Sequence, residues 1–336
     1  MQREYSYIKK AILRTLSENS RATITELAKA AKCSRNTALA NVESLSKELD
    51  IRFTVDFDKE KMGLLHSHII RVNFSKKPEA DALRTIFQSD NISQFVAATE
   101  GNFDLIIYAA CHSGKEYMRW ETALAMKLID YKTVLRPSQM AITHIGFFPL
   151  LNENLETADL SQFKIDRLDK SILLLLNQNS RISYREMAKA LKVNENTVRY
   201  RFIKLEKRGL VNRFSIAIQR PPTEYNIAFF VNYEFTSGTD KRANRAREHY
   251  MSVDGPMPII NKFQMLAPIS GSYRFFGIGC FDDRKDAMEN WTEKHRSIFR
   301  EDKPSISYAE IKEVIKGYLP IRNIDVRKSY SMLKWE

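Results

Sequence analysis

The first fifty residues alternate apolar and polar positions in a pattern that predicts three short helices. Ile12 and Leu16 recur at helical spacing in the first of them. A second begins at the capping box Thr23-Ile24-Thr25-Glu26, and a third begins after Ser34, whose side chain can cap it. A tight turn at Lys32-Cys33 separates these two helices. Two helices joined in this way are typical of a helix-turn-helix unit.

The same pattern returns 160 residues later. A shift of 160 without a gap aligns residues 12–45 with residues 172–205, and 14 of the 34 aligned positions are identical. The triplet Asn19-Ser20-Arg21, for example, matches Asn179-Ser180-Arg181. The sequence therefore predicts an internal duplication, with a second helix-turn-helix in the second half.

Strand-forming segments follow each helical unit. Residues 51–55 and 210–216 are short and β-rich, and we expect each to form a wing. Residues 65–145 and 226–315 then read as strand, helix, strand, strand, helix and strand, with the first helix of the second copy over Lys241–Met251 and the last strand of the first copy reaching Ile145. This order predicts a ferredoxin-like βαββαβ domain in each half.

The predicted fold class is α+β, with two winged helix-turn-helix units alternating with two ferredoxin-like domains. The boundaries are 1–60, 61–150, 164–220 and 222–320, followed by a C-terminal tail, 321–336. We expect the two ferredoxin-like domains to pair within the chain, which makes it a pseudo-dimer. Arg327, Lys328 and Lys334 in the tail either contact DNA or are solvated.

Charge and composition narrow the choice of partner. The 336 residues carry a formal net charge of +12, which favours a polyanion. The three cysteines, Cys33, Cys111 and Cys280, are too far apart to predict a disulfide framework or a zinc site. No apolar run is long enough for a membrane helix and no signal peptide is recognised, so we expect a cytoplasmic protein without a membrane partner.

The motifs resemble a known family. The segments Asn179–Ser183, Glu186–Ala188 and Leu205–Val211 look like the DNA-binding unit of the Lrp/AsnC (feast/famine) transcription regulators. Glu100–Asp104 looks like the opening of the third strand in that family's effector-binding and oligomerisation domain. The resemblance covers nearly the whole chain twice, whereas family members usually carry one copy and assemble as dimers or larger rings. It implies double-stranded DNA as a partner, a small amino-acid-like effector, and homo-oligomers formed through the ferredoxin-like domains.

The two candidate DNA-reading units differ in charge. Residues 1–60 hold 11 basic against 9 acidic residues, whereas residues 166–220 hold 13 against 5, so we expect stronger phosphate contacts from the second unit. Arg199 and Asn196 share one helix face and are the candidates for base contacts. The alternative is that these charges are simply solvated. The full candidate set comprises Asn196, Thr197, Arg199, Tyr200, Arg201 and Lys204, with Arg35, Asn36 and Asn41 in the first unit.

A candidate effector site lies in two glycine-containing loops. Its residues are Gly101, Asn102, Asp104, Gly271 and Ser272. Carbonyl and carboxylate oxygens there can hold an ammonium group, although Gly and Asn between two strands are also ordinary hairpin residues. In the second loop Arg274 replaces the acidic Asp104, which argues against two matched sites.

No catalytic, metal-binding or cofactor-binding motif is recognised. His66 and His68 share a strand face but lack a third ligand for a zinc ion. An enzymatic alternative remains, because proteins resembling siroheme decarboxylases use the same architecture, and His112, His144 and Arg136 could serve a tetrapyrrole. A third alternative is a regulator that contacts another transcription protein through its sheets.

Overall fold

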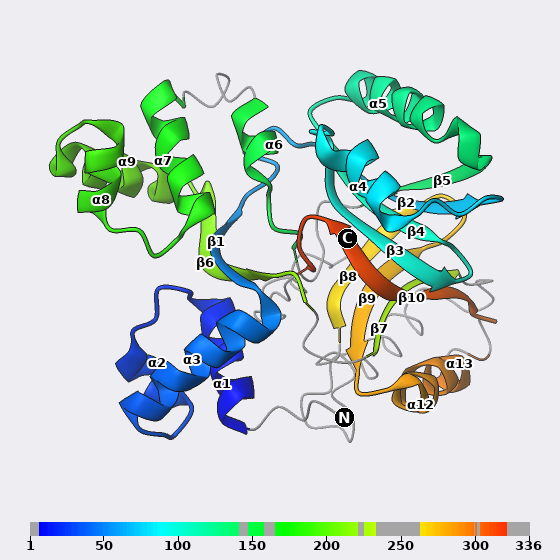
Figure 1. Ribbon diagram of the computed structural model, residues 1–336, viewed down its shortest axis with the longest axis horizontal. Helices are drawn as coiled ribbons and strands as arrows, with labels where there is room; N and C mark the ends of the chain where they lie inside the picture. Colours follow the sequence, from blue (N-terminus) through cyan, green and yellow to red (C-terminus); the bar gives the residue numbers. More distant parts are fainter. Residues whose placement is uncertain are drawn as a thin grey trace, which may run out of the picture.

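The computed structural model describes residues 7–140, 147–157, 165–220, 225–232, 263–298, 300 and 303–320. The helix predicted at Lys241–Met251, the strand end predicted near Ile145 and the tail with Arg327, Lys328 and Lys334 lie outside these ranges. Figure 1 shows two helical units on one side, a β-ribbon beside them and a barrel of strands on the other side. Within the described ranges, no helix has the length and apolarity needed to cross a membrane.

Both helix-turn-helix units contain the three predicted helices. The bounds are α1 (Tyr7–Glu18), α2 (Ile24–Ala30) and α3 (Arg35–Leu49), then α7 (Arg167–Gln178), α8 (Tyr184–Leu191) and α9 (Glu195–Lys207). The predicted capping boxes are present, because Thr23 and Ser183 each accept a hydrogen bond from the backbone of the glutamate three residues later. Lys192 ends α8 in the left-handed conformation, with φ of 54°, which turns the chain into α9.

The predicted wings form one shared ribbon. Strands β1 (Ile51–Phe57) and β6 (Val211–Ile218) pair antiparallel, with Ile51 opposite Ile218 and Phe57 opposite Val211. The expectation of a separate wing in each unit is therefore wrong in this respect, because each unit contributes one strand to a ribbon between them. The pairing gives each strand hydrogen bonds along one edge, which a lone strand would lack.

The remaining strands close into one eight-stranded barrel. The strands are β2 (His66–Phe74), β3 (Ser93–Gly101), β4 (Leu105–Cys111), β5 (Thr133–Met140), β7 (Tyr225–Asn232), β8 (Phe263–Ser270), β9 (Phe275–Phe281) and β10 (Ser305–Lys316). Their order around the barrel is β10-β3-β4-β2-β5-β8-β9-β7. Pairing of β10 with β3 and of β5 with β8 joins the two halves of the chain at two seams. Each half keeps its four strands adjacent, and the expectation of two paired ferredoxin-like domains is corrected in that their sheets join edge to edge, which leaves no free strand edge.

Short helices cover the outside of the barrel. Over β2–β5 these are α4 (Ala80–Gln88), α5 (Gly114–Lys127) and the turn η1 (Ile129–Tyr131). Over the second half they are α12 (Arg284–Ala287), η3 (Met288–Glu293) and α13 (Lys294–Ile298), where Trp291 is buried against Phe229. Helix α6 (Asn152–Thr157) packs beside α7 and connects the barrel with the second helical unit (Figure 1).

Aromatic side chains from both halves meet inside the barrel. The rings of Phe103 and Phe230 lie 5.5 Å apart, and the guanidinium of Arg71 lies 4.3 Å from the ring centroid of Tyr273. Arg71 is only 8% exposed, and burial lowers its pKa. The interior between the two halves is therefore a packed core that encloses the guanidinium of Arg71.

Candidate nucleic-acid interface

Helix α9 presents one polar face to solvent. Asn194 caps its start by accepting a hydrogen bond from the backbone of Asn196. Val198, Phe202 and Leu205 are buried against the rest of the unit, so they form the inward face of the helix. The exposed side chains of the predicted set are Asn196, Thr197, Arg199 and Tyr200. Tyr200 is 67% exposed, which is high for an aromatic residue and leaves its ring free to stack.

Arg201 differs from its neighbours because it already has partners inside the protein. Its Nη1 forms an ion pair with Asp166 and lies 3.2 Å from Oδ1 of Asp169, at the start of α7. The hydrogen bond to Asp166 raises the pKa of Arg201 above its ordinary value. Arg201 therefore ties α9 to α7. Lys204, one turn away from Tyr200 on the same helix, is half-buried.

The first unit offers a less basic face on α3. Arg35 and Asn36 are exposed, whereas the amide of Asn41 donates to the carbonyl of Thr37 at 2.8 Å. Leu39, which occupies the position of Arg199, is 45% exposed. The two candidate recognition helices thus share a scaffold and differ in the chemistry that they expose.

The two units meet on a pseudo-two-fold axis. Oγ of Ser20 lies 2.6 Å from Oγ of Ser180, and both serines are fully buried. Nε of Arg21 donates to the carbonyl of Ser180 at 2.6 Å, and Nε of Arg181 donates to the carbonyl of Ser20 at the same distance. Each guanidinium also stacks on a ribbon phenylalanine, Arg21 on Phe214 at 4.0 Å and Arg181 on Phe53 at 4.1 Å. Such reciprocal contacts are those of an isologous dimer interface, here formed within one chain.

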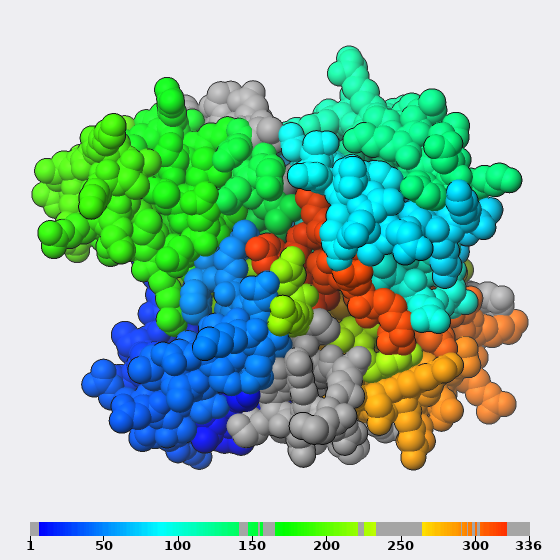
Figure 2. All heavy atoms as spheres, in the orientation of Figure 1, coloured from blue at the N-terminus to red at the C-terminus, as the bar shows by residue number. Residues whose placement is uncertain are grey.

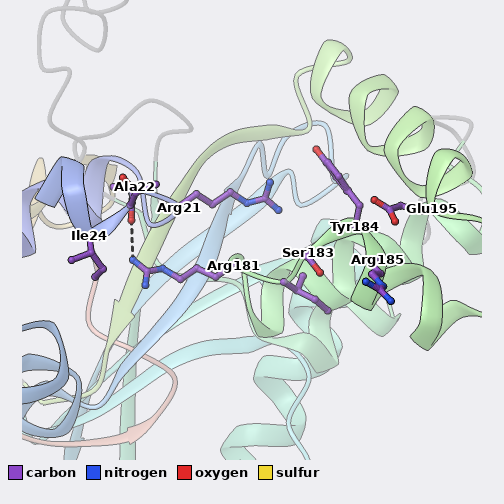
Figure 3. A pocket seen from close by; sticks show the side chains of 10 residues that line it. Arg21, Ala22, Ile24, Arg181, Ser183, Tyr184, Arg185 and Glu195 are labelled. Atoms are coloured by element: carbon purple, nitrogen blue, oxygen red, sulfur yellow. Dashed lines mark hydrogen bonds between the residues drawn. The ribbon is translucent and has the colours of Figure 1, made fainter. Parts of the chain in front are cut away.

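A pocket lies where the two units meet. The axial pocket has a volume of about 560 Å³ and is lined by Arg21, Ala22, Thr23, Ile24, Arg181, Ile182, Ser183, Tyr184, Arg185 and Glu195. Figure 2 shows the two units as separate lobes, the first in blue and the second in green. In Figure 3 the side chains of Arg21 and Arg181 run in opposite directions across the pocket. Sequence reasoning missed this site, because the repeated Asn-Ser-Arg triplet revealed the duplication but not that its copies touch.

The predicted effector residues lie in two loops, one beside each seam of the barrel. Asn102 exchanges two 3.0 Å hydrogen bonds with the backbone of Tyr308 on β10, one through its own backbone and one through its side chain. Oδ2 of Asp104 accepts from the backbone of Phe74 at 2.9 Å, and Oδ1 forms an ion pair with Lys77 at 2.7 Å. These oxygens are thus engaged by the protein itself.

The second candidate loop lies at the opposite seam. Gly271 and Ser272 form the turn between β8 and β9, and Gly271 lies beside Ser138 of β5. The two loops are therefore not brought together around one site. Arg274 occupies the place of Asp104 in the fold, because the backbone N–H of each donates to the matching strand, to Val231 and Val72 respectively.

His112 and Arg136, two of the residues suggested for a tetrapyrrole, are also not brought together. Cys111, just before His112, pairs with His66 at the start of β2, whereas Arg136 pairs with Arg71 near its end. Five strand residues separate these points, which corresponds to roughly 17 Å. Nδ1 of His112 lies 3.0 Å from the carbonyl of Gly63, Nη1 of Arg136 donates to Asn73, and His144 lies outside the described residues.

Comparison with known proteins identifies the helical units. An AsnC-type helix-turn-helix domain model matches residues 165–206, and a winged helix-turn-helix DNA-binding model matches residues 6–48. The chain is 31% identical over 112 residues to an uncharacterized HTH-type transcriptional regulator of Pyrococcus furiosus, covering 33% of this chain and 69% of that protein. A regulator of the same description from Pyrococcus abyssi is 28% identical over 122 residues, covering 36% of this chain and 76% of the relative.

A solved structure shares the whole architecture. The siroheme decarboxylase NirDL superposes with a TM-score of 0.55 at 13% identity, covering 97% of this chain and 99% of that one. At this identity the likeness concerns the fold alone. The sequence relatives are HTH-type transcriptional regulators, and both matched models are helix-turn-helix domains. The chain therefore belongs to the Lrp/AsnC family of helix-turn-helix transcriptional regulators.

Proposed function

We propose that the protein is a sequence-specific DNA-binding transcription regulator in which one chain supplies both units of a pseudo-dimer. The observation that carries this proposal is the exposed polar face of α9 in a unit joined to its copy through Ser20 and Ser180. The pairing sets the distance between the two candidate recognition helices. A second chain is then not needed to present two such helices to DNA.

Helix α9 supplies the specific contacts in this proposal. Arg199 and Asn196 are exposed, lie three residues apart and carry the donors that suit guanine and adenine edges in the major groove. Thr197 and Tyr200 flank them, and Lys204 contacts phosphate. We assign Arg201 to the packing of α9 on α7 because its charge is paired with Asp166 and Asp169.

Helix α3 contributes weaker contacts through Arg35 and Asn36. Leu39 and Ala40 stand where α9 carries Arg199 and Tyr200, so α3 lacks the matching donors. Two recognition helices with different exposed side chains, related by a pseudo-two-fold axis, favour an asymmetric DNA site or an imperfect palindrome. Asn41 has its amide bonded within the helix and is left out of the contact set.

The barrel acts as the dimerisation core in this proposal. Each half corresponds to one ferredoxin-like domain, and the seams β3–β10 and β5–β8 replace the contacts between two chains. Asn102 and Asp104 have a structural role in this proposal, because their side-chain oxygens accept hydrogen bonds from the protein backbone. An effector that used them would have to displace these bonds.

The experiment is fluorescence anisotropy of the full chain with duplexes selected from a random-sequence library. Between about 50 and 200 mM salt, we expect affinity to fall by orders of magnitude, as for a protein that contacts several phosphates. The absorbance spectrum of the same sample tests the enzymatic alternative. Weak binding together with tetrapyrrole absorbance would overturn the regulator assignment.

A further inference from the structure

The axial pocket is positively charged. Of its ten lining residues, Arg21, Arg181 and Arg185 are basic and Glu195 is the one acidic residue. None of the three arginines forms an ion pair with a carboxylate in the part of the chain that the structure describes. Nη2 of Arg21 is buried and has no hydrogen-bond partner there. A concave surface of this kind attracts an anion.

Two of the arginines are held rigidly in place. Arg21 and Arg181 each donate through Nε to a serine carbonyl of the other unit, at 2.6 Å, and each stacks on a ribbon phenylalanine. Arg181 also donates through Nη2 to the carbonyl of Ala22 at 3.3 Å (Figure 3). Because their positions are fixed by the fold, their charge contributes to binding without further loss of side-chain entropy. Arg185, in contrast, is exposed on the first turn of α8.

The pocket lies beside the helices that would contact a duplex. Its lining includes Tyr184 and Arg185 at the start of α8 and Glu195 at the start of α9. In a helix-turn-helix complex the start of the recognition helix approaches the bases, and the helix before it crosses the sugar-phosphate backbone. Both units lie on the side of the ribbon away from the barrel (Figure 1). We therefore place a duplex held by α3 and α9 together over the pocket.

We propose that the axial pocket binds the DNA backbone between the two recognition helices. Arg185 contacts a phosphate directly, and Arg21 and Arg181 supply a fixed positive potential on the axis. The apolar walls formed by Ile24 and Ile182 suit the sugars. This inference rests on the proposed function and adds a third point of contact to it. Such a contact makes the bending of central base pairs, which no side chain reads directly, part of the specificity.

The contact is asymmetric. At the position of Arg185 the first unit carries Thr25, and at that of Tyr184 it carries Ile24. The second unit therefore supplies both the more basic recognition helix and the direct phosphate contact. We expect the central phosphates that the protein contacts to lie closer to the half-site that α9 occupies than to the other half-site.

The test replaces Arg185 with glutamine in the full chain. Arg14→Gln is the matched control, because Arg14 is an exposed arginine that pairs with Glu18 on α1 and does not line the pocket. On the selected duplex we expect R185Q to bind about tenfold more weakly and the salt slope to fall by about one. We expect R14Q to bind within about twofold of the wild type. Ethylation of one or two central phosphates should block the wild type but not R185Q.

The other outcomes show whether the pocket contact, the regulator assignment or both are wrong. If the wild type binds DNA steeply with salt, and R185Q matches it in affinity, slope and ethylation pattern, the pocket contact is wrong and the regulator assignment stands. If the wild type does not bind DNA, both fail. If millimolar inorganic phosphate raises the melting temperature of the wild type but not of R185Q, while the ethylation patterns agree, the pocket holds a small anion and the inference is overturned.

Discussion

The hydroxyl oxygens of Ser20 and Ser180 lie 2.6 Å apart, and 160 positions separate these residues in the chain. This is also the shift that aligns the two copies of the sequence repeat. A residue that touches its own duplicate must lie on the axis that relates the copies. The duplication therefore produced an interface as well as a second unit.

Replacing Ser180 with alanine should lower the free energy of unfolding by about 1–3 kcal/mol, because the buried hydroxyl of Ser20 loses its partner. Urea denaturation of the full chain measures this. The double variant Ser20→Ala/Ser180→Ala should cost little more than either single one, since neither unsatisfied hydroxyl remains. Fully additive costs would show that the two hydroxyls do not depend on each other.

Arg199→Ala should weaken binding to the selected site by about 1–3 kcal/mol while leaving scrambled duplexes nearly unaffected, as expected for a base contact. Lys204→Ala should instead weaken all duplexes alike. Anisotropy titrations on both duplexes measure the difference. An equal loss on selected and scrambled DNA for Arg199→Ala would reassign that residue to phosphate.

Arg201→Ala should lower thermal stability more than it lowers DNA affinity, because it removes the tie between α9 and the start of α7. With Arg201 28% exposed, the pair is partly screened, and we expect a loss of about 1 kcal/mol. Thermal melting of this variant and of Arg199→Ala provides the comparison. A large and sequence-dependent affinity loss with unchanged melting would place Arg201 at the DNA instead.

Asp56→Asn should change how stability depends on pH. Burial raises the pKa of Asp56 from 3.8 to about 6, against the opposing charges of Arg213 and Lys59. Between these values the folded state keeps a proton that the unfolded state releases. The free energy of unfolding therefore falls as pH rises from about 4 to 6, by up to about 3 kcal/mol from this group.

Denaturation at several pH values isolates that contribution, since the other carboxylates are common to both proteins. In the asparagine variant, the free energy of unfolding should fall less between about pH 4 and 6 than in the wild type, because the contribution of Asp56 is absent. Identical pH profiles for the two proteins would mean that Asp56 ionises normally despite its burial.

Gly101→Ala should destabilise the protein by about 2–3 kcal/mol, because the backbone of β10 passes directly over this glycine. An added Cβ would lie 2.8 Å from the carbonyl oxygen of Tyr308 and 2.9 Å from Cα of Ala309, and φ is +147°. Gly271 also has a positive φ, +122°, but Gly271→Ala should cost less, since the nearest atom there, Oγ of Ser138, is 3.4 Å away. Chemical denaturation of both variants compares the loss of stability at the two seams. An equal loss would contradict the closer contact between β3 and β10.

The helices of both DNA-binding units could be predicted from the sequence because their signals are local. Apolar spacing and capping boxes such as Thr23 with Glu26 act within one or two helical turns. The internal repeat shows the same signals a second time, which supports the assignment of each helix. The same local chemistry marked α9 as the more basic helix. Its exposed face follows directly from the burial of Val198, Phe202 and Leu205.

Only the tertiary structure decided how the strands pair and which charges are engaged. Strand edges carry only backbone groups, so hydropathy cannot tell whether β1 forms a wing or pairs with β6, or whether two sheets close into a barrel. Likewise Arg199 and Arg201 look alike in the sequence, yet one is exposed and the other is bound to Asp166 and Asp169 from another helix. Such contacts depend on residues distant in the chain, so they cannot be predicted from the sequence pattern around each residue.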